Sequence, residues 1–354
     1  MLKGEKKHIM NDAILSFFSN IGLGTMPAAI ILFVIGLVAL IKGGDWFVDG
    51  ATGIAHRFHI PEILIGATVV SIGTTLPEVM VSATSAAKGL GDIAYGNAIG
   101  SVICNTALIA ALSFAIHPTT VDKKSFRTPV IFFFIAALFY SGVAYFGGKF
   151  TRFTGIVLLL MFVVYMVITV RQALKNPQIP QETTETAPEA DEKPKKEPST
   201  VKDIIFLIIG AALIAVGATL LVDNGTIIAE GIGVPKSVIA LTFVALGTSL
   251  PELVTAITSL VKGHSSLSLG NIVGANLFNL VLVSGLSTTI SPFAVPSEKL
   301  IGGLNASLVI DIPLMLAVMA LMTLPTLARG KMSRYQGIIL LVIYAGFCIF
   351  QFAF

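Results

Sequence analysis

The stretch "SIGTTLPEVMVSATSAAKG" (Ser71–Gly89) decides the fold, because it places a carboxylate directly after a proline inside an otherwise apolar segment. A carboxylate is costly in hydrocarbon, and a proline inside a helix removes one backbone hydrogen bond. The same pattern returns as "ALGTSLPELVTAITSLVKG" (Ala245–Gly263). Two costly features that recur together indicate a site with a function.

The composition of the 354 residues places the chain among membrane proteins, because 55% are hydrophobic and only 12% are charged. The mean hydropathy is +0.88. The net charge of +3 is small and the basic residues form no stripe, so we expect no nucleic-acid partner. Cys104 and Cys348 show no CxxC spacing, and we interpret them as core residues.

Ten apolar segments are long enough to cross a bilayer as helices, which takes about 20 residues each. They cover residues 27–55, 61–87, 93–116, 128–147, 153–172, 204–230, 235–261, 266–290, 304–326 and 335–353. The sequence therefore predicts an all-α membrane protein with ten transmembrane helices.

A polar stretch, "KNPQIPQETTETAPEADEKPKKEPST" (Lys175–Thr200), separates the first five segments from the last five. Its composition is typical of a flexible linker, and it is too short and polar for a folded regulatory domain. We predict an N-terminal extension (1–26), a first transmembrane unit (27–172), the linker (173–202) and a second unit (203–354). We predict a plasma-membrane protein. Lys and Arg concentrate on the linker side, which favours a cytoplasmic linker and both termini outside.

The two transmembrane units are copies of each other. A shift of 174 residues aligns Glu78 with Glu252 and Asn105 with Asn279, and 15 of the 38 positions from Thr68 to Asn105 are identical to their counterparts. A second match, "TRFTGIVLLL" (151–160) with "SRYQGIILLV" (333–342), lies at a shift of 182. Because each copy has five helices, the second copy is inverted in the membrane. Inverted repeats are typical of secondary transporters with a site between the halves.

The duplicated motif is rich in oxygen ligands. Pro77 cannot donate to the carbonyl of Gly73, so we expect the helix to open there, and Pro251 with Gly247 repeats the arrangement. Each glutamate follows two hydroxyl residues: Thr74 and Thr75 in the first copy, Thr248 and Ser249 in the second.

Hard cations fit this donor set. Ca²⁺ takes six to eight oxygen ligands, whereas softer metals prefer nitrogen or sulfur, and no histidine lies at the centre of a predicted span. Two carboxylates are neutralised by one divalent or two monovalent ions. Since Ca²⁺ and Na⁺ have similar radii, they can compete for the same oxygens, which is the simplest basis for exchange.

The next helix of each copy carries polar residues on one face. Asn97, Ser101 and Asn105 recur every four residues, and the second copy has Asn271, Ala275 and Asn279 there. Glycines beside them allow close helix packing. Asn97 and Asn271 are therefore either ligands or interhelical hydrogen-bonding residues.

The two motifs, their separation and "GDWFVDG" (Gly44–Gly50) resemble the sodium/calcium exchangers of the calcium/cation antiporter superfamily, over essentially all ten spans. The resemblance implies a calcium/sodium antiporter in which Glu78 and Glu252 are the shared central ligands. It further implies a ligand set that comprises Ser71, Thr74, Thr75, Ser101, Asn105, Ala245 through its carbonyl, Thr248, Ser249 and Asn279. Beyond the transported Ca²⁺ and Na⁺ and the lipid bilayer, we expect no cofactor, and we expect a monomer.

Two positions depart from the resemblance. Some close relatives carry a hydroxyl at the position of Ala275 and an acid at that of Asn279, so the usual ratio of three sodium ions per calcium is in doubt. Asn279 also argues against the potassium-dependent branch, and the threonine of each motif favours sodium over protons.

Three alternatives stay open at this stage. In a Ca²⁺/H⁺ antiporter the same glutamates would titrate. A cation channel would also use carboxylates, but the inverted duplication disfavours it. An intramembrane enzyme lacks support, since neither HExxH nor GxSxG occurs. We expect Asp45 and Asp49 to be structural, and Lys88 and Lys262 to reach the membrane interface.

Overall fold

The computed structural model describes residues 24–175, 200–232, 247–297 and 300–353. Within these ranges, nine helices are long and apolar enough to cross a membrane, and their bounds confirm nine of the predicted spans to within a few residues. The predicted seventh span (235–261) lies partly outside the described residues, and its last part forms the shorter apolar helix Leu250–Val261. Most of the predicted N-terminal extension and linker lie outside the described residues.

The first copy runs from α2 (Thr25–Arg57) through α3 (Glu62–Ile65), α4 (Ser71–Ala87), α5 (Gly91–Cys104), α6 (Ala111–Ile116), β1 (Thr119–Thr120), α7 (Lys123–Gly142) and β2 (Lys149–Phe150) to α8 (Arg152–Lys175). The second copy contains α9 (Thr200–Gly231), α12 (Leu250–Val261), α13 (Ser265–Phe278), α14 (Ser284–Ile290), β3 (Phe293–Ala294), β4 (Leu300–Ile301), β5 (Leu304–Asn305), α15 (Ile312–Arg329), β6 (Lys331–Met332) and α16 (Arg334–Ala353). Wider π-helical turns join several of these helices, at Gly66–Val70, Asn105–Ala110, Val143–Gly147, Asn279–Val283 and Ser307–Asp311.

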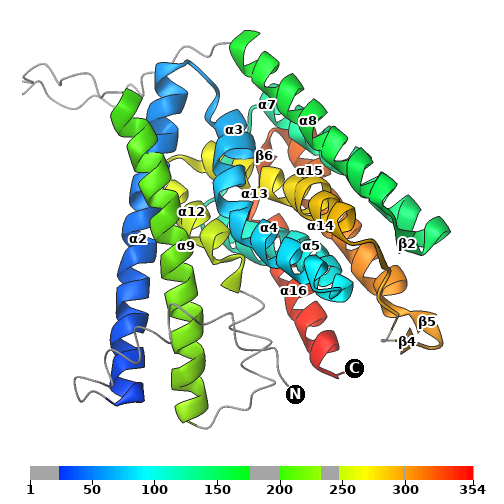
Figure 1. The fold of residues 1–354 in the computed structure, drawn as a ribbon. Helices are drawn as coiled ribbons and strands as arrows, with labels where there is room; N and C mark the ends of the chain where they lie inside the picture. Colours follow the sequence, from blue (N-terminus) through cyan, green and yellow to red (C-terminus); the bar gives the residue numbers. More distant parts are fainter. Residues whose placement is uncertain (1–23, 176–199, 233–246, 298–299, 354) are drawn as a thin grey trace, which may run out of the picture.

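The ends of the bundle show that the second copy is inverted. Figure 1 shows that α2 begins and α16 ends at the same end of the molecule, while α8 ends and α9 begins at the other, which we call the linker side. Short antiparallel strand pairs join the copies at each end, β1 with β6 and β2 with β3. Thr119 pairs with Met332, and their repeat counterparts Phe293 and Phe150 pair with each other. The two copies are thus related by an approximate two-fold axis.

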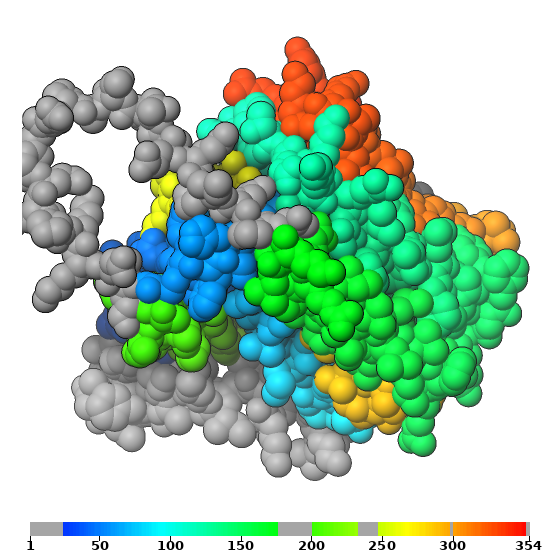
Figure 2. All heavy atoms as spheres, turned by 90° about the horizontal axis from the view of Figure 1, so that it is seen from above, coloured from blue at the N-terminus to red at the C-terminus, as the bar shows by residue number. Residues whose placement is uncertain are grey.

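Helices that face outward carry many exposed apolar side chains, such as Ile30, Val34 and Val38 on α2, and Ile205 and Ile208 on α9. Exposed apolar side chains are stable where they contact the hydrocarbon tails of lipids. Seen from the linker side, α2 (blue) and α9 (yellow-green) lie together on one flank of the molecule, away from α7 (teal) and α16 (red) (Figure 2). The pair therefore stands at the edge of the bundle.

Helices α2 and α9 contact each other through glycines along their length. A Cβ atom added at Gly36 would lie 2.9 Å from the carbonyl oxygen of Gly217, and one at Gly43 would lie 3.0 Å from that of Gly210. Gly36 and Gly210 are repeat counterparts, as are Gly43 and Gly217, so the contact follows the two-fold relation. Because glycine has no side chain, the two backbones lie close together, and few side chains interdigitate at these positions.

We expect Gly43→Ala to lower the melting temperature by roughly 5 °C, because the added methyl group would lie 2.8 Å from the backbone nitrogen of Ile214, and overpacking costs about 1–3 kcal/mol. Gly142→Ala in α7 is the matched control, since its Cβ would meet no atom within 4 Å. Thermal unfolding in detergent measures both. Equal melting temperatures for the two variants would contradict the close contact.

Candidate ion-binding site

The site is built around Glu78 and Glu252. Their helices, α4 and α12, contact each other where the two copies meet. Both residues are fully buried, and none of their four carboxylate oxygens has a hydrogen-bond partner. The two groups are close enough for their charges to interact. Buried polar groups in folded proteins are nearly always satisfied, so two unpaired carboxylates indicate a missing partner of positive charge.

The helices that carry the glutamates differ at the proline. In the second copy the chain makes a turn at Thr248 and Ser249 before α12 begins at Leu250, with Pro251 in the first helical turn. In the first copy α4 continues from Ser71 through Pro77. The predicted opening at Gly73 is therefore wrong for the first copy: a proline removes one hydrogen bond, and packing of α4 against α5, α13 and α14 keeps the rest of the helix intact.

Two hydrogen bonds connect the copies next to the glutamates. The hydroxyl of Thr74 donates to Oδ1 of Asn271 at 3.2 Å, and the hydroxyl of Thr248 donates to Oδ1 of Asn97 at 3.4 Å. These are the same interaction with the copies exchanged. The asparagines for which the sequence left two alternatives thus form interhelical hydrogen bonds. In the sequence, the glycine beside each of these asparagines already indicated close helix packing at this position.

Asn97 and Ser71 hold the surrounding backbone. The amide of Asn97 also donates to the Glu78 carbonyl at 3.3 Å and to the Ser82 hydroxyl at 2.8 Å, which fixes α5 against α4. The Ser71 hydroxyl donates to the carbonyls of Gly66 and Asn271, at 2.7 and 2.9 Å. These hydrogen bonds to α5 and α13 fix the backbone of α4, and with it the position of Glu78.

Of the other predicted residues, some lie near the glutamates and others are buried without a hydrogen-bond partner. Thr74 and Thr75 lie beside the Glu252 carboxylate, and Ser249 lies beside Cys104, the neighbour of Asn105 in sequence. The side-chain atoms of Thr75, Ser249, Asn105 and Asn279 are buried without a hydrogen-bond partner. Ser101 and Ala275 are buried at equivalent positions of α5 and α13. Ala245 lies outside the described residues.

Asn105 and Asn279 each begin a π-helical turn, Asn105–Ala110 and Asn279–Val283. A π-helical turn is uncommon and frequently marks a functional site, since it re-aims side chains and loosens the backbone ladder. The sequence did not predict these turns, because no residue type enforces them. Their occurrence at the same position of both copies links them to the site.

The donor set suits a hard cation. Within the described ranges, no group of three or more His, Cys, Asp and Glu side chains is placed to hold a metal ion. The hydroxyls of Thr74 and Thr75 lie beside the Glu252 carboxylate, and the Thr74 hydroxyl contacts the amide oxygen of Asn271. These oxygens are hard ligands. A narrow crevice lies beside the two motifs and is lined by Phe47, Gly73, Thr74, Pro77, Ala211, Ile214, Ala215 and Pro251. Helices α2 and α9 therefore form one wall of the approach to the motifs.

An inverted repeat with a buried carboxylate pair between its copies defines a secondary transporter of cations. Comparison with known proteins agrees: the family model described as sodium/calcium exchanger protein matches residues 28–171 and 202–353. This chain belongs to the sodium/calcium exchanger family.

Individual relatives cover nearly the whole chain. An uncharacterized membrane protein of Methanocaldococcus jannaschii is 34% identical over 88% of this chain and 94% of its own length. The sodium/calcium exchanger MaX1 of Methanosarcina acetivorans is 28% identical over 91% and 98%. A solved structure of the sodium-calcium exchanger NCX_Mj, soaked with zero Na⁺ and Ca²⁺, superposes with a TM-score of 0.73 at 30% identity, over 90% of this chain and 96% of that one.

Proposed function

We propose that this protein exchanges Ca²⁺ for Na⁺ by alternating access at a midplane site formed by Glu78 and Glu252. The observation that carries the proposal is the pair of fully buried carboxylates without hydrogen-bond partners. Taking charges out of water costs several kcal/mol per ion, and a bound cation offsets that cost. One Ca²⁺ or two Na⁺ would balance the two negative charges.

The proposed ligands come from both copies. Thr74, Thr75, Ser71, Ser101 and Asn105 belong to the first copy, and Thr248, Ser249, Asn279 and the carbonyl of Ala245 belong to the second. The unpaired atoms of Thr75, Ser249 and the two asparagines support this set, because a buried oxygen without a donor is available to a cation. Ala275 offers no hydroxyl, so the second copy has one oxygen fewer at that position.

Sodium is the proposed driving ion. Relatives such as MaX1 are named as sodium/calcium exchangers, and soaks of NCX_Mj with Na⁺ and Sr²⁺ address ion exchange in that protein. The alternative is a Ca²⁺/H⁺ antiporter in which Glu78 and Glu252 bind protons instead of sodium. A dependence of calcium uptake on a pH gradient alone would favour that alternative.

Alternating access requires a part that moves past the site. Helices α2 and α9 are the proposed moving part, because their glycine contact follows the bundle edge and Phe47 of α2 lies against Gly73 of the motif. In this proposal the transmembrane units, 27–172 and 203–354, are joined by a cytoplasmic linker (173–202), with residues 1–26 as an N-terminal extension and the protein in the cell membrane.

Equilibrium binding of radioactive calcium to purified protein tests the shared site. We expect sodium to displace calcium with a steep dependence on its concentration, since two or more Na⁺ must replace one Ca²⁺. Choline at the same ionic strength is the control and leaves calcium bound. Calcium binding that is indifferent to sodium but is lost on acidification would replace sodium by protons as the exchanged ion.

A further inference from the structure

We propose that the contacts of Lys262 with Asp45 and Asp49, which we call the clasp, hold the linker side closed. We further propose that Lys88 forms the repeat-equivalent contact, the second clasp, with Asp223 when the linker side opens. The inference rests on the proposed alternating access. It concerns residues outside the ion site, at the two ends of the moving helices.

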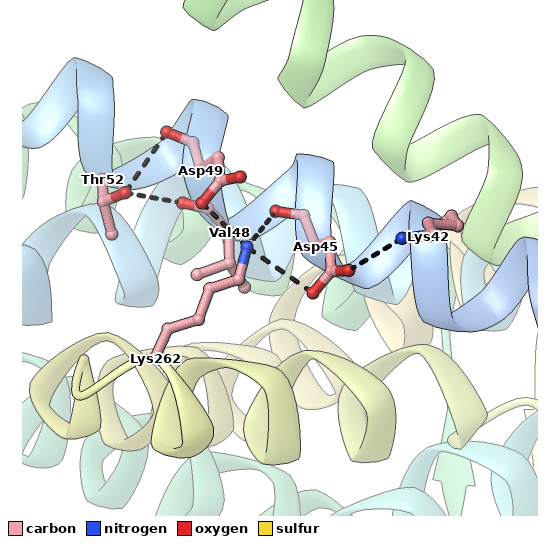
Figure 3. Close-up of polar contacts among 6 residues, drawn as sticks. All are labelled: Lys42, Asp45, Val48, Asp49, Thr52 and Lys262. Atoms are coloured by element: carbon pink, nitrogen blue, oxygen red, sulfur yellow. Dashed lines mark hydrogen bonds and ion pairs between the residues drawn. The ribbon is translucent and has the colours of Figure 1, made fainter.

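The clasp is formed in the structure. Lys262 follows the end of α12, and its Nζ donates to Oδ1 of Asp49 at 2.8 Å and to the carbonyl of Asp45 at 2.9 Å, with Oδ1 of Asp45 at 3.5 Å (Figure 3). Three oxygens of α2 thus surround one ammonium group. The lysine therefore does more than reach the membrane interface, as its sequence position suggested.

The clasp joins a moving helix to an ion-carrying helix. Glu252 lies ten residues before Lys262, and α12 between them packs on α2, where a Cβ at Gly44 would lie 2.7 Å from Val254 and 2.9 Å from Oγ1 of Thr258. Opening the linker side by movement of α2 separates these contacts and breaks the clasp. The clasp therefore adds to the stability of the closed linker side alone.

The inverted repeat supplies its counterpart. A shift of 174 residues converts Lys262 to Lys88, Asp49 to Asp223 and Asp45 to Thr219. Lys88 is exposed just after α4, on the side opposite the linker, and forms no ion pair with another described residue. Because the copies exchange conformations during alternating access, Lys88 reaches Asp223 in the opposite state. Thr219 has no charge, so the second clasp is the weaker one and the pair favours a closed linker side.

The size of the effect follows from the exposure of the partners. The side chain of Lys262 is 25% exposed, and those of Asp45 and Asp49 are 36% and 50% exposed. Exposed ion pairs contribute little singly, and networks contribute more. We therefore expect loss of the clasp to change the population of the open linker side by roughly three- to tenfold.

The test uses a single reporter cysteine at Thr255, which is fully buried between Glu252 and Lys262, in a background with Cys104→Ser and Cys348→Ser. The rate of labelling by a water-soluble maleimide in detergent reports opening of the linker side. We expect Lys262→Met and Asp49→Asn each to raise the rate three- to tenfold, and the double variant to raise it no further. Lys88→Met lowers the rate, because it removes the clasp of the open state.

Lys42→Met is the matched control. Lys42 also faces Asp45, but at 3.9 Å and with a 63% exposed side chain, so its loss leaves the labelling rate unchanged. Unchanged labelling in both Lys262→Met and Asp49→Asn would overturn the clasp, and faster labelling in Lys88→Met would overturn its counterpart. Because labelling needs no ion gradient, these failures are distinct from a failure of calcium/sodium exchange.

Discussion

Glu252→Gln should abolish sodium-dependent calcium uptake, with a loss of at least about 100-fold in rate. The amide keeps the shape of the side chain but removes one of the two buried charges that balance the cation. Breaking a buried charge pair costs about 3–5 kcal/mol, and each 1.4 kcal/mol is a factor of ten. Initial rates of calcium uptake into proteoliposomes measure the effect.

Glu78→Gln should be as severe, because the repeat gives the two glutamates equivalent places, and the double variant should be no worse than either single one. Asp92→Asn is the control, since this carboxylate is exposed in the first turn of α5. Normal uptake by either glutamate variant would remove that residue from the site.

Calcium should raise the melting temperature of the wild-type protein by roughly 5 °C relative to protein freed of Ca²⁺ and Na⁺. A ligand at 100 times its Kd adds about 2.7 kcal/mol to the folded state. In the ion-free protein the two carboxylates remain buried and repel each other. The cation both removes this repulsion and supplies the missing partner.

The variant with both Glu78→Gln and Glu252→Gln tests whether the stabilisation by calcium depends on these two residues. Without ions it should melt at a higher temperature than the ion-free wild type, because neutral amides are less costly to bury than unpaired charges. It should show no shift with calcium. Scanning fluorimetry in detergent measures both proteins, and a calcium shift of equal size in the two would place the bound ion elsewhere.

Much of the fold follows from the sequence. Apolar length predicted the spans, and the shift of 174 residues predicted the inverted copies, because hydropathy and duplication are properties of the chain itself. The strand pairs that join the copies were not predicted, since each strand has only two residues and no pattern of its own.

The candidate site was predicted as a set of residues rather than as a geometry. The sequence placed Glu78 and Glu252 together, but it could not decide the role of Asn97 and Asn271, because the hydroxyls that donate to their Oδ1 atoms lie in the other copy. It also treated Pro77 and Pro251 alike, whereas α4 continues through Pro77 and α12 begins next to Pro251. The packing of α4 against its neighbouring helices keeps it intact at the proline, and a short sequence motif does not reveal such neighbours. The ion pairs of Lys262 with Asp45 and Asp49 were not predicted either, because those partners belong to the other copy.

Calcium uptake into proteoliposomes preloaded with sodium, at a clamped membrane potential, tests the central claim most directly. Vesicles without internal sodium, and vesicles with only a pH gradient, are the comparisons. The proposed exchanger takes up calcium when internal sodium is present and not otherwise. Uptake that follows the pH gradient and ignores sodium would contradict it, and would make Glu78 and Glu252 groups that exchange protons for calcium.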